Sequence, residues 1–140
     1  MKKVLFLMQD LGAGGAERVL VNLVNHMDHE EYEITVLTLF DDGVNALNLS
    51  PKVRYISMHF RKFKGMRILL QCMPKRWIYN HYVRFKDYDV IVAYMTGIPT
   101  LIAVGSKQPK IAWLHGCFGR RNTFSINFFL KYFGMKHCYD

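Results

Sequence analysis

The sequence lacks a hydrophobic run long enough to cross a membrane. Hydrophobic residues make up 51% and charged residues 21% of the 140 positions, which is the composition of one globular domain. No apolar stretch approaches the roughly 20 residues that a transmembrane helix needs. Residues 1–8 begin like a signal peptide, but their apolar part is short and Gln9 and Asp10 interrupt it. We therefore expect these residues to hold the first strand of the domain, and the protein to stay in the cytoplasm.

Cysteine is scarce, and no two cysteines lie close together in the sequence. Cys72, Cys117 and Cys138 are an odd number of thiols, which suits a reducing compartment. A zinc finger is excluded because no second ligand pair follows His115 and Cys117 at the required spacing. The sequence also lacks a nucleophile-elbow serine triad and the paired carboxylates of a self-contained hydrolase. We expect no bound metal.

Acidic residues are absent from one strongly basic segment. Between positions 61 and 86 there are eight basic residues and no acidic one, whereas the first 58 residues carry eight acids and five bases. The formal net charge of +8 is therefore concentrated in one part of the chain. This pattern predicts either an anionic partner at one face or a solubilising surface whose acids lie elsewhere in space. The eight bases are Arg61, Lys62, Lys64, Arg67, Lys75, Arg76, Arg84 and Lys86.

The apolar pattern alternates between strand and helix periods. Strands are expected at residues 4–8, 34–40, 53–57, 89–95 and 110–114. Helices are expected at residues 16–27, 66–73, 75–85, from Pro99 onward, and at 123–133. This alternation predicts an α/β fold with a doubly wound parallel sheet, Rossmann-like in form. Residues 137–140 look like the start of a sixth strand, so we expect the chain to be part of a longer protein.

Three glycines, Gly12, Gly14 and Gly15, lie between the first strand and the first helix. In open α/β sheets, ligands bind beyond the carboxyl ends of the strands. A helix N-terminus at that edge offers unpaired N–H groups and a partial positive charge, both suited to phosphate. Glycine allows close approach of the backbone to a ligand, and it tolerates positive φ. The turn is therefore predicted to receive a phosphate group.

Two known phosphate-binding patterns fit this turn poorly. A P-loop requires Lys followed by Ser or Thr after its last glycine, and Ala16 and Glu17 stand there instead. The dinucleotide fingerprint requires a glycine where Glu17 stands. Its ribose-binding acid is expected about 20 residues further along the chain. The nearest candidates at the end of the second strand, Asp41 and Asp42, come later than that. A nicotinamide site and a tight turn chosen only for helix packing both stay open as alternatives.

His115 ends the fifth expected strand, at the same edge of the sheet as the glycine turn. A histidine there can orient a sugar hydroxyl or assist charge movement at a reacting centre, or it can make a structural hydrogen bond. The next residue, Gly116, indicates close approach by a ligand or another domain. Arg120 and Arg121 follow on the same loop, where they can meet an anion or remain surface residues.

Two motifs together resemble a known family. Residues 14–20, Gly-Gly-Ala-Glu-Arg-Val-Leu, resemble the amino-terminal signature of family 4 glycosyltransferases with the GT-B fold. Residues 113–116, Trp-Leu-His-Gly, resemble a second landmark of the same domain. The resemblance implies that residues 1–140 are the amino-terminal, acceptor-side domain of a two-domain GT-B enzyme. The carboxyl-terminal nucleotide-sugar domain, with its glutamate pair, would be absent and the chain alone inactive.

The resemblance also implies an activity and roles for residues. A sugar passes with retention from a nucleotide diphosphate sugar to a glycan or lipid-linked acceptor, without a metal or other cofactor, in polysaccharide or glycolipid biosynthesis. Gly14 and Gly15 would lie beside the donor diphosphate, and His115 near the transferred sugar. Bases would face the acceptor or the anionic inner face of the membrane that carries it; the candidates are Arg61, Lys62, Lys64, Arg120 and Arg121.

The basic segment also allows a non-enzymatic alternative, a nucleic-acid-binding module. Aromatic residues alternate with its charges, as in single-strand binders. Periodicity places several of these aromatics in the core, and no nucleic-acid-binding motif is present, so we expect no nucleic-acid partner. The aromatic residues are Phe60, Phe63, Trp77, Tyr79, Tyr82 and Phe85.

Overall fold

The computed structural model describes residues 1–40, 43–61, 63–83 and 87–113. Five parallel strands form one sheet in the order β3-β2-β1-β4-β5. This arrangement confirms the predicted α/β fold with a parallel, doubly wound sheet. The strands are β1 (Lys2–Met8), β2 (Tyr32–Thr38), β3 (Arg54–Ser57), β4 (Val90–Ala93) and β5 (Lys110–Ala112).

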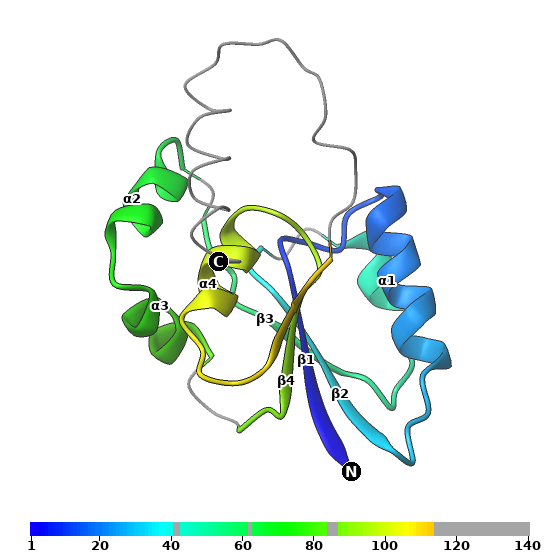
Figure 1. Cartoon of the computed structure of the whole chain (residues 1–140). Helices are drawn as coiled ribbons and strands as arrows, with labels where there is room; N and C mark the ends of the chain where they lie inside the picture. The colour runs from blue at the N-terminus through cyan, green and yellow to red at the C-terminus, as the bar shows by residue number, and fades with distance from the viewer. Residues whose placement is uncertain (41–42, 62, 84–86, 114–140) are drawn as a thin grey trace, which may run out of the picture.

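Helices cover both faces of the sheet (Figure 1). One face carries α1 (Gly15–His26) and the short 3-10 helix η1 (Val44–Asn48). The other carries α2 (Met66–Cys72), α3 (Lys75–Tyr82) and α4 (Ile98–Val104). In the described ranges, no helix is long and apolar enough to span a bilayer.

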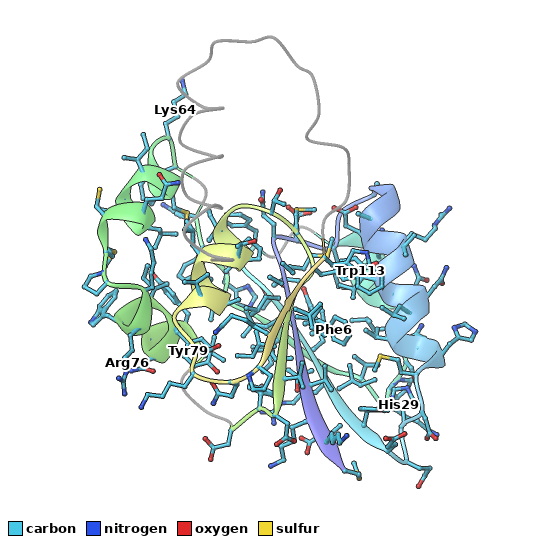
Figure 2. All side chains as sticks on the ribbon, in the orientation of Figure 1. Phe6, His29, Lys64, Arg76, Tyr79 and Trp113 are labelled. Atoms are coloured by element: carbon cyan, nitrogen blue, oxygen red, sulfur yellow. The ribbon has the colours of Figure 1, made fainter. Side chains whose placement is uncertain are left out.

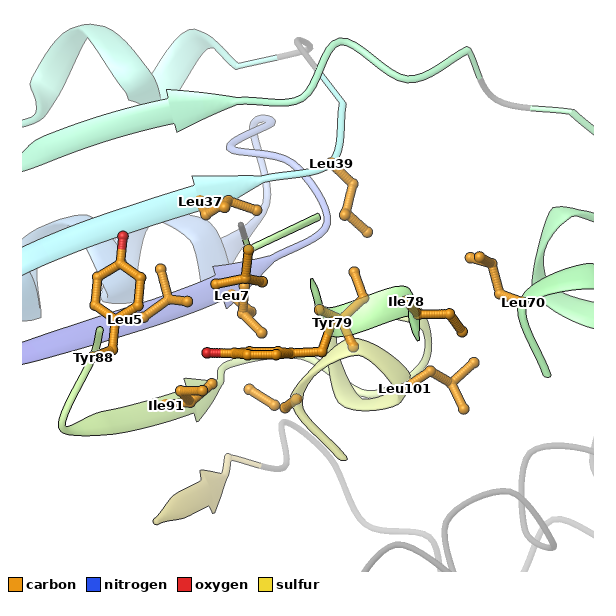
Figure 3. Close-up of a cluster of buried hydrophobic side chains, with 14 of the residues drawn as sticks. Leu5, Leu7, Leu37, Leu39, Leu70, Ile78, Tyr79, Tyr88, Ile91 and Leu101 are labelled. Atoms are coloured by element: carbon orange, nitrogen blue, oxygen red, sulfur yellow. The ribbon is translucent and has the colours of Figure 1, made fainter. Parts of the chain in front are cut away.

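Strand β1 lies at the centre of the sheet and is buried on both faces. Val4 and Phe6 pack under α1, whereas Leu5 and Leu7 pack under α2, α3 and α4. Figure 3 shows the second of these clusters, with Leu5 and Leu7 beside Tyr79 from α3. Burial of each such apolar side chain stabilises the fold by about 1.5–3 kcal/mol. The continuous apolar run in the sequence is therefore explained by burial of alternate residues in two separate cores.

Every predicted element within the described residues is present, with shifted ends. The second strand was expected at residues 34–40 but spans Tyr32–Thr38, because its register is set by β1, which pairs Lys2 with Tyr32. Leu39 and Phe40 leave the sheet, and both of their N–H groups donate to the carbonyl oxygen of Gln9. The helix expected at 123–133 and the strand start at 137–140 lie outside the described residues.

The contact between α3 and α4 depends on a glycine. A Cβ on Gly105, just after α4, would overlap the carbonyl oxygen of Lys75 and lie 2.8 Å from the Cβ of Tyr79. The backbone at the end of α4 therefore touches the first turn of α3 directly. No larger residue fits without separating the two helices.

We predict that Gly105→Ala lowers the free energy of unfolding by about 1–3 kcal/mol, because the added methyl group overpacks this contact. Gly15→Ala is the matched control: a Cβ at Gly15 would meet nothing within 4 Å. That control should change stability by no more than about 0.5 kcal/mol. Urea unfolding of both variants measures the difference. Equal effects would contradict the proposed close packing at Gly105.

Candidate functional site

The candidate site lies at the carboxyl ends of β1 and β4, which are neighbours in the sheet. The chain leaves β1 for α1 on one face and leaves β4 for α4 on the opposite face (Figure 1). Such a reversal is the position where open α/β sheets bind their ligands. The glycine turn follows β1 directly, so the structure places Gly14 and Gly15 at this position, as the sequence predicted.

The glycine turn ends at the N-terminus of α1. Gly14 is the N-cap residue, with extended backbone angles (φ −73°, ψ 162°) and no side-chain cap. The first intrahelical bond joins the Arg18 N–H to the Gly14 carbonyl oxygen at 3.3 Å. The N–H groups of residues 15–17 therefore have no intrahelical acceptor, as at the start of any α-helix. Of these three residues Gly15 is exposed, whereas Ala16 is half-buried and Glu17 is buried.

The reason for glycine at position 14 differs from the expected one. Positive φ was expected in this turn, but among the described glycines only Gly65 and Gly97 have it. The constraint at Gly14 is instead steric, because a Cβ there would overlap the carboxylate of Glu17. A Cβ at position 14 would displace the Glu17 carboxylate from its place beside the start of the helix.

Glu17 also lies at the candidate site. In the sequence it was noted only as a departure from the dinucleotide pattern. Its side chain is 9% exposed and lies in the first turn of α1. A carboxylate at this end of a helix interacts favourably with the helix dipole, typically by about 0.3–1 kcal/mol. Because the Glu17 carboxylate lies beside Gly14, the unobstructed approach to the helix start is at Gly15, where no atom lies within 4 Å of an added Cβ.

Asn45 holds the glycine turn in place from a distant part of the sequence. Its Nδ2 group donates to the Gly12 carbonyl oxygen, and its backbone N–H donates to the Leu11 carbonyl oxygen at 3.0 Å. The Gly12 N–H in turn donates to Oδ1 of Asp10 at 3.2 Å. Asn45 and Leu11 are both buried. The connection between β2 and β3 therefore fixes the backbone that leads into α1.

The sequence analysis missed Asn45. One signal was available, because Gly43 indicates a turn after the second strand. That turn lies at the carboxyl edge of the sheet, where the parallel strand β1 also ends. A polar residue in the following short helix then has backbone carbonyls of the glycine turn within reach. The partner of that amide could not be identified without the fold.

We predict that Asn45→Ala lowers the free energy of unfolding by about 0.5–1.5 kcal/mol, because it removes the hydrogen bond to the part-buried Gly12 carbonyl. It should also speed amide hydrogen exchange at Gly12 and Arg18, whose N–H groups donate hydrogen bonds within this turn. Asn48→Ala is the control, since Asn48 is exposed in the same 3-10 helix. Urea unfolding and hydrogen exchange measure both effects. Unchanged exchange at the glycine turn in the Asn45 variant would show that Asn45 does not order it.

Aromatic side chains line the ends of β4 and β5 beside the glycine turn. Tyr94 is fully buried and lies edge-on to Phe6, with ring centroids 6.3 Å apart. The ring centroids of Trp113 and Tyr94 lie 5.1 Å apart, and the backbone N–H of Trp113 donates to the Ala93 carbonyl oxygen at 2.9 Å. Burial raises the pKa of the Tyr94 hydroxyl. These contacts extend the packed sheet to its carboxyl edge. Figure 2 shows Phe6 and Trp113 near the centre of the molecule.

Gly97 forms the second turn at this edge, between β4 and α4. Its φ of 111° requires glycine, and a Cβ there would meet no atom within 4 Å. The predicted sites His115, Arg120 and Arg121 lie outside the described residues, as do Asp41 and Asp42. Trp113 is the last described residue and lies just after the carboxyl end of β5. In the sequence it comes two positions before His115.

The basic segment does not act as one surface. Arg61, Lys64 and Arg76 are exposed, but the ammonium group of Lys75 donates to the carbonyl oxygens of Leu70 and Gln71, at 3.2 and 2.7 Å. Lys75 therefore caps the end of α2, and its charge is used within the fold. Lys62, Arg84 and Lys86 lie outside the described residues, as does the side chain of Arg67.

Arg61 and Lys64 are not brought to the glycine turn. They follow β3, which is separated from β1 by β2 in the sheet. Two parts of the predicted site are therefore distinct in the structure, the glycine turn at the centre of the sheet and the basic residues at its β3 side. Among the described residues, no group of three His, Cys, Asp or Glu side chains is placed to hold a metal ion.

The doubly wound sheet, with its glycine turn beside the crossover reversal, defines a Rossmann-like α/β domain. The family model described as Glycosyltransferase Family 4 matches residues 13–138. The chain therefore belongs to glycosyltransferase family 4, and the resemblance seen in residues 14–20 and 113–116 is confirmed. A glycosyltransferase role follows, with a sugar donor and an acceptor as the partners in general. No curated protein matches the chain.

Proposed function

We propose that this domain serves the transfer of a sugar from a nucleotide diphosphate sugar to a glycan or lipid-linked acceptor. The transfer proceeds with retention and without a metal or other cofactor, in polysaccharide or glycolipid biosynthesis. One observation carries the proposal: in a family 4 chain, the start of α1 is open at Gly15 and lies where α/β sheets bind ligands.

The proposed chemistry is electrostatic. When the bond between the sugar and the diphosphate breaks, negative charge builds up on the leaving diphosphate. The N–H groups at the start of α1, beginning at Gly15, and the positive end of the helix dipole would stabilise that charge. Asn45 supports this role because it fixes the turn before a ligand arrives, so the donors need little reorganisation during the reaction. The Glu17 carboxylate lies beside Gly14, so the diphosphate would approach the helix start from the side of Gly15.

His115 is proposed to position the transferred sugar, and Arg120 and Arg121 to meet the acceptor. These residues follow β5, the strand next to β4 at the same edge of the sheet. The family resemblance, not a described contact, supports their roles.

The glycine turn offers a ligand only one wall. Sites for small molecules usually bury most of the ligand surface, and Gly15 is open to solvent. We therefore propose that catalysis needs a second domain facing this edge, which would hold the nucleotide and supply the glutamate pair. The 140 residues alone should bind nucleotide sugars weakly and transfer no sugar.

The test compares two variants of the full-length enzyme that should fail in different ways. Gly15→Val places a branched side chain where the diphosphate must approach, so donor binding and activity should both be lost. Any loss of stability should be modest, within about 0.5 kcal/mol, because no atom crowds the position. His115→Ala should lower turnover by about 100-fold or more while donor binding is retained.

The control is Asn22→Val, which adds the same side chain to an exposed position of α1 away from its first turn. It should leave activity unchanged. Donor binding is measured by calorimetric titration, and transfer by product formation. Full activity with valine at position 15, or tight nucleotide-sugar binding by the 140-residue chain, would contradict the proposed site.

A further inference from the structure

Among the described residues, Glu17 is the one charged side chain that is buried. It is 9% exposed, and no hydrogen bond or ion pair joins its carboxylate to another described residue. The buried Thr100 hydroxyl, by contrast, donates to the Met95 carbonyl oxygen at 3.2 Å, as buried polar groups usually do. A buried charge without a partner is costly. Glu17 therefore calls for a role outside the packing of the fold.

The Glu17 carboxylate lies at the start of α1, next to the proposed phosphate site. A Cβ on Gly14 would overlap Oε2 of Glu17 and lie 3.2 Å from Oε1. The carboxylate oxygens thus stand beside the N-cap residue, one position before the open approach at Gly15. The helix dipole offsets part of the cost of burying this charge. It supplies no hydrogen bond to the oxygens, so their lone pairs remain available to a ligand.

A bare phosphate would satisfy only half of this site. The N–H groups from Gly15 onward favour an anion, but the charge of Glu17 repels one at short range. A ligand that carries a hydroxyl group next to its phosphate meets both demands. Its phosphate accepts from the backbone N–H groups, and its hydroxyl donates to the carboxylate in a charge-assisted hydrogen bond.

We infer that Glu17 accepts a hydrogen bond from a hydroxyl of the sugar whose phosphate lies at Gly15. Glu17 thereby makes the site selective for sugar phosphates over phosphates without a hydroxyl group. A site built to bond a hydroxyl rejects analogues that lack it, because its buried polar group then stays unpaired. The inference rests on the proposed donor site at the glycine turn and adds a residue that sets its specificity.

A metal cation is favoured less as the partner of Glu17. Divalent cations take several oxygen ligands, and in the described part of the chain no three His, Cys, Asp or Glu side chains are grouped to supply them. Asp10, the other acid of the turn, already accepts from the Gly12 N–H through Oδ1 at 3.2 Å. A bound diphosphate can supply oxygen ligands of its own, so Mg²⁺ is included as a variable in the test.

The amide chemical shifts of Gly15 and Ala16 in the ¹⁵N-labelled chain measure the binding of probes with the same charged group. Methyl phosphate has no hydroxyl group, whereas glucose, galactose and mannose 1-phosphates add a hydroxylated ring to the same phosphate monoester. In EDTA, at least one hexose 1-phosphate should bind about tenfold or more tightly than methyl phosphate, as expected for a hydrogen bond to a charged acceptor. Galactose and mannose each differ from glucose in the orientation of one hydroxyl, so differences within the panel point to the hydroxyl that Glu17 accepts.

Two substitutions separate the charge of Glu17 from its capacity to accept a hydrogen bond. Glu17→Gln keeps the shape and removes the charge, and Glu17→Ala removes the acceptor as well. Both should bind methyl phosphate about threefold more tightly than the parent chain, because the repulsion is gone. In Glu17→Ala the preference for hexose phosphates should fall to about twofold or less. The control is Glu30→Gln, which should bind like the parent chain, since Glu30 is exposed beyond the opposite end of α1.

Urea unfolding separates a role in ligand binding from a structural one. Glu17→Gln should leave the urea midpoint unchanged or raise it, because it removes a buried charge that the fold leaves unpaired. A lowered midpoint together with an unchanged preference for hexose phosphates would show that Glu17 only stabilises the helix, and would overturn the inference. Binding that tightens only with Mg²⁺, in the parent chain but not in Glu17→Gln, would also overturn it, since a cation would then take the place of the hydroxyl.

Failure of this inference and failure of the proposed donor site give different results. Equal binding of methyl phosphate and every hexose 1-phosphate, with shifts at Gly15 and Ala16, would overturn the role of Glu17 alone. Unmoved amides at Gly15 and Ala16 with every phosphate, in the parent chain and in both Glu17 variants, would overturn the donor site as well.

Discussion

The hydrogen bonds from Asn45 to the glycine turn are the constraint on which the candidate site depends. They join the segment after β2 to the segment after β1, so two distant parts of the sequence define one backbone geometry. Without them, the segment from Leu11 to Gly12 would be held by the local Asp10 bond and by the burial of Leu11. The start of α1 would then lose its fixed position relative to β4, and with it the preorganised donors that the proposed chemistry requires.

Most of the fold could be predicted from the sequence because burial imposes regular patterns. Residues 4–8 read as a strand buried on both faces, and Pro74 marked the break between α2 and α3. Strand ends were less predictable, because β2 begins and ends where its residues pair with those of β1. Gly105 could not be interpreted at all, since its requirement comes from a backbone contact with α3, 30 positions earlier in the sequence.

The site was predictable in its position but not in its details. Gly14 and Gly15 were identified from their place between a strand and a helix, a local pattern. Glu17 and Asn45 were missed for two reasons: the fold-back of Glu17 depends on a side-chain rotamer, and the bond of Asn45 depends on tertiary structure. The use of the Lys75 charge could not be predicted for a similar reason, since it satisfies the last carbonyls of α2. Charge runs identify a segment, whereas the fold decides which of its charges face outward.

The most direct measurement of the central claim is the amide chemical shift of the glycine turn in the ¹⁵N-labelled chain during titration with inorganic pyrophosphate. Pyrophosphate presents the diphosphate without a nucleotide, so the result does not depend on the identity of the donor. The account predicts that the amides of Gly15 and the following Ala16 move most and saturate together, while Gly65, in the turn before α2, stays unchanged. Unmoved amides at Gly15 and Ala16, with shifts concentrated near Lys64 and Arg76, would contradict it.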